Sequence, residues 1–331
     1  LKRSHPPSPR MRSPSLPTSS SCWAAISSSE TRAPSRATLR PARVAKGDSR
    51  PYQVLAGNVS GANPFFRDRR VRRALAHSLD RKRACRRLGF TPCHGPFHPD
   101  SPWADPEGER LAHDPAAAAR LLDAAGWRRD GRGWRRRRCF YREEGGERRW
   151  LPGPEGAAGA EVVPLAFTLL LPAGSTATRD LCLRWREALA RLGVQVALAD
   201  TERGELVRRL FAHRFTAAFF AWTPGVDPYT TAEVFGSRGW PEGRNLGGYR
   251  CPEVDELYAR AAGEMEPAAR RRIYRRIDRL IRRDQPYLFL WYLPRAAALD
   301  PGLRGLGFGP QGLFGFHPGL RGWWFAAGGE E

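Results

Sequence analysis

Apolar residues recur with two different periods along the chain, and the two kinds of segment alternate. Short apolar runs lie at 162–171, 194–198 and 215–222, and between them leucines recur every three or four positions. The runs have the length and composition of strands, whereas the spaced leucines mark one face of a helix. Alternation of this kind needs crossover connections. It therefore predicts an α/β fold with a mixed sheet flanked by helices.

Aspartates mark where several helices begin. Asp68, Asp80 and Asp114 each precede a segment with helical spacing, and an aspartate at that position accepts a hydrogen bond from a free backbone N–H group. The first of these helices should place Val71, Leu75 and Leu79 on one face. The third should end near Gly126, because glycine readily adopts the left-handed conformation that ends a helix.

The second half of the chain shows the same patterns. Pro252 is predicted to open an amphipathic helix, and a buried strand is expected at 287–293. The helix predicted at 267–283 has isoleucines and a leucine on one face and most of its eight arginines on the other. We interpret those arginines, and the run Arg135–Arg138 in a hairpin or loop insertion predicted at 128–160, as solvated surface.

The charge of the chain raises the question of nucleic-acid binding. The 331 residues carry a net charge of +21 with 27% charged residues, and lysine occurs only at Lys2, Lys46 and Lys82. Arginine can neutralise phosphates, so a nucleic-acid-binding protein is one hypothesis. The charge is dispersed, however, and no base-stacking motif accompanies it. An arginine-rich composition spread over solvated faces is the interpretation we favour, with no nucleic-acid partner.

The sequence holds no motif for catalysis or for a cofactor. G-x-S-x-G, H-E-x-x-H, a Walker loop and a strand followed by G-x-G-x-x-G are all missing, so we predict no enzyme and no cofactor. The six cysteines show no C-x-x-C pair. Cys93, His94 and His98 lie close together, but they lack a second ligand pair and we predict no metal site. No apolar stretch approaches the roughly 18 residues of a membrane span.

The stretch that follows the strand at 215–222 offers the best candidate binding site. Ligand sites in open α/β folds lie beyond the carboxyl ends of strands, and this stretch gathers aromatic and polar groups there. Each candidate also has a structural interpretation: core packing for the tryptophan, a turn cap for the aspartate, and turn closure for the last two residues. The candidate ligand-binding residues are Trp222, Asp227, Tyr229, Asn245 and Tyr249.

Motifs in this stretch resemble a known family. The run W-T-P-G-x-D-P from Trp222, then G-x-N-x-x-x-Y and P-E-V-D-x-L, resembles the extracellular solute-binding proteins of the oligopeptide, dipeptide and nickel type, family 5. Segments 63–81, 114–127 and 269–294 resemble the same family in the same order. The resemblance implies a type II periplasmic-binding-protein-like lobe. It also implies non-covalent capture of a peptide or similar small solute between two lobes.

The resemblance further implies an ABC permease in the membrane as partner, a monomer, and a periplasmic or extracellular, membrane-associated location. In peptide-binding members the carboxylate that holds the ligand's α-amino group stands three residues after the tryptophan. That position is Gly225 here. Peptides, sugars and metal chelates therefore all stay open as ligands.

The resemblance also suggests how the chain is divided. We expect a disordered Ser/Pro/Arg-rich tail at 1–50, the solute-binding lobe at 51–299, and a return segment towards the other lobe at 300–331. Cys22 lacks the preceding apolar run of a lipoprotein signal. Since the family's first lobe precedes the segment that begins near Pro51, the second lobe is expected to be incomplete. A truncated product without ligand function is the remaining alternative.

Overall fold

The structure is a computed structural model that describes most of the chain after residue 42. The described ranges are 43–59, 63, 65–144, 147–152, 160–225, 227–305 and 319–325. For 43–50, 141–144, 147–152, 294–297 and 319–320 only the backbone is described. The tail predicted at 1–50 lies outside the described residues up to residue 42. Residues 43–50 belong to the first strand, which begins before the predicted boundary at Pro51.

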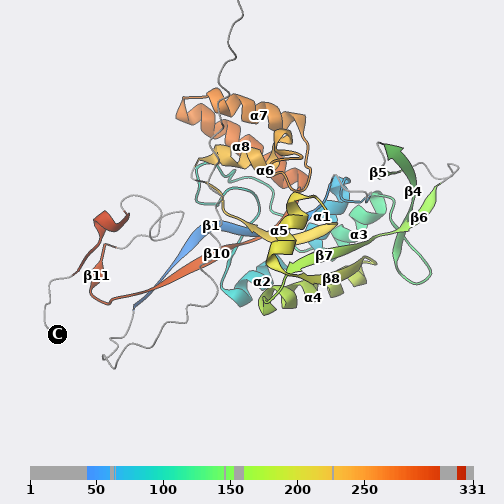
Figure 1. Cartoon of the computed structure of the whole chain (residues 1–331), viewed down its shortest axis with the longest axis horizontal. Coiled ribbons are helices and arrows are strands. Elements are labelled where there is room, and N and C mark those ends of the chain that lie inside the picture. Colours follow the sequence, from blue (N-terminus) through green and yellow to red (C-terminus); the bar gives the residue numbers. More distant parts are fainter. Residues whose placement is uncertain are drawn as a thin grey trace, which may run out of the picture. The chain divides into compact units, whose positions relative to one another are not determined.

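A six-stranded mixed sheet forms the centre of the fold (Figure 1). Its strands are β1 (Arg43–Gly57), β2 (Thr91–Pro92), β7 (Ala166–Pro172), β8 (Gln195–Thr201), β9 (Ala217–Trp222) and β10 (Tyr287–Leu299). The order is β2-β10-β1-β9-β7-β8. Strand β1 pairs antiparallel with β9 and β10, and β2 pairs antiparallel with β10, whereas β7 is parallel to both β8 and β9. The predicted α/β fold with a mixed sheet is confirmed.

Helices pack against both faces of this sheet. One face carries α1 (Arg69–Ser78), α2 (Arg81–Leu88), α3 (Pro115–Ala124) and α4 (Thr176–Arg191). The other carries α5 (Arg203–Phe211), α6 (Ala232–Phe235), α7 (Pro252–Gly263) and α8 (Pro267–Asp284). Successive strand residues therefore feed opposite cores: Phe219 packs with the first set of helices and Phe220 with the second.

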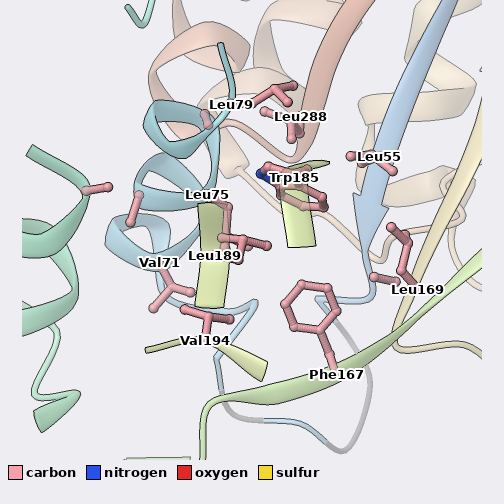
Figure 2. Close-up of a cluster of buried hydrophobic side chains, with 14 of the residues drawn as sticks. Leu55, Val71, Leu75, Leu79, Phe167, Leu169, Trp185, Leu189, Val194 and Leu288 are labelled. Atoms are coloured by element: carbon pink, nitrogen blue, oxygen red, sulfur yellow. The ribbon is translucent and has the colours of Figure 1, made fainter. Parts of the chain in front are cut away.

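The first core is built around a tryptophan of α4 (Figure 2). Val71, Leu75 and Leu79 enter it at the predicted helical spacing, and Phe167 enters from β7. The Trp185 indole is 4% exposed and donates a hydrogen bond of 2.8 Å to the Ser78 hydroxyl. Burial of each large apolar side chain contributes about 1.5–3 kcal/mol, so this core fixes α1 and α4 on the sheet.

The three predicted aspartate caps are confirmed. Asp68 accepts a hydrogen bond from the backbone N–H of Arg70, Asp80 from that of Arg83, and Asp114 from that of Ala117, at 2.8–2.9 Å. Each helix therefore begins where the sequence predicts, because the cap satisfies a backbone donor that has no partner inside the helix.

A smaller sheet contains the predicted hairpin. Its strands are β3 (Arg128–Arg129), β4 (Arg135–Glu144), β5 (Glu147–Pro152) and β6 (Glu161–Pro164). Strands β3, β5 and β6 each pair with β4. The single strand predicted at 162–171 is wrong, because the chain passes from β6 to β7 at Leu165. The Leu165 N–H donates to the carbonyl of Arg135 in the small sheet, and its carbonyl accepts from Gln195 at the start of β8.

Two arginines predicted at the solvated surface are buried instead. Arg135 is 2% exposed; its guanidinium donates to the carbonyls of Leu192 and Trp127 and to the Asp123 carboxylate at 2.6–2.7 Å. Arg282 of α8 is 4% exposed and lies 2.7 Å from the Asp278 carboxylate. Both interpretations as surface are wrong, because partners distant in the sequence or one helical turn away offset the cost of burial.

The remaining elements are short. They are η3 (Pro228–Thr231), η4 (Ser237–Gly239), η5 (Gly319–Gly322), β11 (Leu303–Arg304) and β12 (Trp324–Phe325), with β11 and β12 paired. The return segment predicted at 300–331 lies partly outside the described residues. Among the helices that are described, none has the length and apolar character needed to cross a bilayer.

Candidate ligand-binding loop

Trp222 is the last residue of β9, and the candidate loop follows it. Trp222 lies opposite Tyr52 of β1, and the centre of its half-buried ring is 5.8 Å from the centre of the Phe220 ring. The chain then leaves the sheet at Pro224 and Gly225, where the Gly225 N–H donates to the Thr230 hydroxyl. The loop thus folds back on itself directly beyond the carboxyl end of the strand.

Asp227 and Tyr229 lie together at the start of η3. The Asp227 carboxylate accepts a hydrogen bond of 2.8 Å from the Tyr229 N–H, which is the predicted turn cap. It also forms an ion pair of 2.9 Å with Arg270 of α8, yet 54% of its side chain stays exposed. The Tyr229 side chain is 44% exposed. A carboxylate and a phenol are therefore accessible on the same turn.

Arg270 is held by aromatic rings as well as by Asp227. Its guanidinium carbon lies 5.9 Å from the centre of the Trp103 ring and 5.5 Å from that of Tyr274. These distances are in the range of cation–π attraction. The Asp227 turn is thereby attached to α8 and to the segment around Trp103.

The segment 96–103 faces the loop across a narrow cavity of about 20 Å³. The Tyr292 hydroxyl donates a hydrogen bond of 2.9 Å to the Phe97 carbonyl, and the Tyr292 ring lies 4.5 Å from that of His98. Phe97 and Trp103 also pack on Tyr274. One wall beside the candidate loop is thus aromatic.

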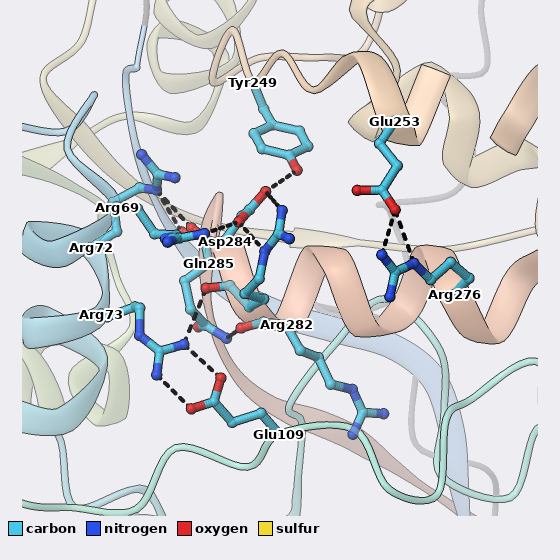
Figure 3. Close-up of polar contacts among 11 residues, drawn as sticks. Arg69, Arg72, Arg73, Glu109, Tyr249, Glu253, Arg276, Arg282, Asp284 and Gln285 are labelled. Carbon is cyan, nitrogen blue, oxygen red and sulfur yellow. Dashed lines mark hydrogen bonds and ion pairs between the residues drawn. The ribbon is translucent and has the colours of Figure 1, made fainter. Parts of the chain in front are cut away.

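Asn245 and Tyr249 form a separate group whose polar atoms are bonded inside the protein. The Asn245 amide donates to the carbonyls of Gly236 and Tyr249, at 3.1 and 2.7 Å, and accepts from the Tyr249 N–H at 3.0 Å. Its side chain is fully buried. The Tyr249 hydroxyl donates to Asp284 at 2.8 Å (Figure 3). This is the turn closure that the sequence offered as an alternative.

The two groups lie at opposite ends of β9. The 245–249 turn bonds to Val59, just past the end of β1, and the last residue of β1, Gly57, pairs with Ala217 at the start of β9. Trp222 is the last residue of β9, about 17 Å further along at 3.3 Å per residue. The structure therefore brings Asp227 and Tyr229 together and places Asn245 and Tyr249 elsewhere.

Arg81 at the start of α2 and His94 are two ionisable groups close to each other; Arg81 is 5% exposed and His94 is half-buried. Arg81 and His94 approach to 2.8 Å through a ring nitrogen of the histidine. Burial, and then the charges of Arg81 and Arg282, lower the pKa of His94 to about 3. Among the described residues, no three His, Cys, Asp or Glu side chains are grouped so as to hold a metal ion.

Sequence reasoning missed Arg270, Trp103 and the 96–103 wall. Nothing local marks them, because Trp103 precedes Asp227 by more than a hundred residues and Arg270 is one of eight arginines in its helix. Only the packing of α8 against both segments brings them to the loop.

Comparison with known proteins agrees with a solute-binding lobe. The model of the bacterial extracellular solute-binding proteins, family 5, middle region, matches residues 25–241. The chain therefore belongs to this family, as the motifs indicated.

Relatives in the curated collection are distant. Protein XP55 of Streptomyces lividans is 26% identical over 250 residues, covering 74% of this chain and 41% of the relative. The oligopeptide-binding protein AppA of Bacillus subtilis is 24% identical over 272 residues, covering 80% and 45%. The chain thus spans less than half the length of these relatives.

Solved structures share the fold. AppA from Bacillus subtilis in complex with a nonapeptide superposes with a TM-score of 0.69 at 22% identity, covering 88% of this chain and 53% of that one. NikZ from Campylobacter jejuni in complex with Ni(L-His) gives 0.67 at 20% identity, covering 86% and 54%. The type II periplasmic-binding-protein fold expected for the lobe is confirmed.

Proposed function

We propose that this chain provides a lobe of a substrate-binding protein that delivers a small solute to an ABC permease. The ligand is captured without covalent chemistry, between this lobe and another. The family match carries this proposal and favours it over the nucleic-acid hypothesis. A periplasmic or extracellular location, a permease partner and a monomeric state belong to the same proposal.

The loop after β9 is the part of the lobe that we assign to the ligand. Trp222, Asp227 and Tyr229 keep part of their surface accessible at the carboxyl end of the strand. A flat indole can form a wall for the ligand, and the carboxylate can accept hydrogen bonds from an amine, amide or hydroxyl. Asn245 and Tyr249, which are bonded inside the protein, are assigned a positioning role.

The ligand class follows from the accessible groups. Gly225 offers no carboxylate, and the nearby Asp227 is shared with Arg270. A ligand amine must therefore compete with a guanidinium for this carboxylate. We infer that the solute relies more on apolar and aromatic contact than a peptide held by its amino terminus would.

Calorimetric titration tests the proposal. The whole chain is titrated with a nonapeptide mixture and, separately, with the nickel–histidine chelate, up to millimolar concentrations. Contacts with this lobe are expected to give a dissociation constant of about 1 mM, which corresponds to a binding free energy of about 4 kcal/mol. Trp222→Ala should abolish the heat, whereas Trp324→Ala, a change at a tryptophan that is 58% exposed in β12, should leave it unchanged.

Loss of the Asp227 carboxylate gives a second test. Asp227→Asn retains the oxygen that caps η3 but loses the negative charge. If the carboxylate binds the ligand, affinity should fall about tenfold, as for a hydrogen bond to a charged group. Unchanged affinity in both Trp222→Ala and Asp227→Asn would remove the loop from the binding site.

A further inference from the structure

Six arginines surround a groove far from the candidate loop. The groove has a volume of about 940 Å³ and lies between the start of α1, the end of α8 and the turn that holds Tyr249. The arginines that line it are Arg67, Arg69, Arg70, Arg72, Arg250 and Arg283. Among the described residues, the carboxylates that line it with them are Asp68 and Asp284. The lining therefore carries a surplus of four positive charges.

Asp284 orders one side of the groove (Figure 3). Its carboxylate is 9% exposed and receives Arg69 at 3.2 Å, Arg283 at 2.8 Å and the Tyr249 hydroxyl at 2.8 Å. Burial by itself would raise the pKa of Asp284, but the hydrogen bonds from Arg283, Tyr249 and Arg69, together with the charge of Arg283, lower it. This single carboxylate thus stays ionised and fixes two guanidinium groups that remain 51% and 42% exposed.

Two further arginines of the groove are held in place, one by hydrogen bonds to backbone carbonyls and one by an ion pair. Arg72 donates to the carbonyls of Asp284, Gln285, Phe66 and Arg67 at 2.8–3.1 Å. Arg70 lies against Asp68 at 2.7 Å with its side chain 47% exposed. Guanidinium groups held in this way lose little further freedom when they bind a ligand.

The positive charge of Arg250 is not balanced by an ion pair with any described residue. Arg250 is exposed, and within the described parts of the chain no carboxylate lies within ion-pair distance of it. Trp240, which is half-buried, also lines the groove. The groove therefore combines exposed positive charge with an aromatic surface.

We propose that this groove is a binding site for an anion that carries two or more phosphate groups. A planar guanidinium group can donate two parallel hydrogen bonds to two oxygens of one phosphate, and several guanidinium groups line this groove. The groove opens at the end of β9 opposite Trp222, so it can be occupied together with the solute site. The phosphate can come from a soluble ligand or from a lipid headgroup, since the recognition chemistry is the same.

Paired double variants test the site. Arg69→Gln with Arg250→Gln removes two groove charges, and Asp284 keeps Arg283 and Tyr249 as partners. The matched control is Arg271→Gln with Arg272→Gln, which removes two charges from exposed residues near the other end of α8. The single variant Arg250→Gln is included because it breaks no ion pair among described residues. Thermal unfolding checks that all variants fold.

The probes are sodium tripolyphosphate and vesicles containing phosphatidylglycerol, both at physiological salt. We expect the groove variant to bind tripolyphosphate about a hundredfold more weakly, about tenfold for each guanidinium, and the control variant to bind as the original chain does. Vesicle binding lost in the groove variant alone would assign the lipid headgroup. Tripolyphosphate binding without vesicle binding would assign a soluble anion.

Two results would overturn the proposal. One is equal weakening in the groove and control variants, which would mean diffuse attraction to a chain of net charge +21. The other is no measurable tripolyphosphate binding by the original chain. The indole resonance of Trp240 gives an independent readout, because it should shift with tripolyphosphate while that of Trp222 does not.

Discussion

At the scale of single residues, internal hydrogen bonding separates structural groups from accessible ones. The sequence offers both Asn245 and Asp227 as candidate ligand-binding residues. In the structure, the Asn245 amide forms hydrogen bonds with three backbone groups, whereas about half of the Asp227 side chain is exposed. The two residues should therefore respond differently to substitution.

Asn245→Ala should destabilise the protein by about 3 kcal/mol, because buried backbone groups lose their partners. Asp227→Asn should cost less than about 1 kcal/mol, since an exposed ion pair contributes little. Urea unfolding followed by circular dichroism measures both. A neutral Asn245→Ala would show that the 245–249 turn holds together without this amide, and its positioning role would have to be abandoned.

His94 makes the stability depend on pH. The unfolded chain protonates this histidine near its ordinary pKa of 6.5, whereas the folded protein, with a pKa of about 3, does not. Acid therefore favours the unfolded state between those values. From about pH 6.5 to about pH 4.5 the His94 contribution to the unfolding free energy should fall by about 2 kcal/mol.

His94→Gln isolates this contribution, because glutamine can accept the Arg81 hydrogen bond but does not titrate. The difference in unfolding free energy between the original chain and His94→Gln should change with pH over this window, in favour of the variant at low pH. A difference that is constant with pH would rule out the histidine as its source.

At the scale of elements, α8 has two kinds of arginine on one helix. Its apolar residues Ile273, Ile277 and Ile281 are buried as the period predicts. Arg271 is exposed, but Arg282 is buried beside Asp278. The helical period places Arg282 one turn after Asp278, and it is the segment 105–108, packed over both, that removes them from water.

Arg282→Gln should lower the free energy of unfolding by about 3 kcal/mol or more, because the buried Asp278 carboxylate loses its positively charged partner and, among the described residues, keeps only the Asp105 N–H. Arg271→Gln should stay within about 0.5 kcal/mol, as an ordinary surface change does. Thermal and chemical unfolding of the two variants make the comparison. Equal small effects would mean that water reaches the Asp278–Arg282 pair.

At the scale of the whole molecule, local patterns predicted the elements and long-range contacts escaped prediction. Caps such as Asp114 and faces such as that of α7 depend on residues a few positions apart, and both are confirmed. The division at Leu165 depends on partners in two different sheets. The burial of Arg135 depends on carbonyls at 127 and 192. No pattern within either segment encodes such partners.

The candidate site divides in the same way. Trp222, Asp227 and Tyr229 follow from the strand end and the motif, which are local signals. The opposing wall at 96–103, and the placement of Tyr249 at the other end of β9, follow only from the packed sheet. A sequence pattern can thus indicate a candidate loop, but the wall beside it follows from the topology.

We propose that the solute binds at the loop after β9. The most direct measurement is the nuclear magnetic resonance spectrum of the tryptophan indoles during titration with the nonapeptide mixture and the nickel–histidine chelate, with Trp222→Phe to assign the resonance. We predict that the Trp222 resonance shifts with one of these solutes, while those of Trp240 and Trp324 stay in place. A shift confined to Trp240, or a bound solute that leaves Trp222 unchanged, would contradict the account.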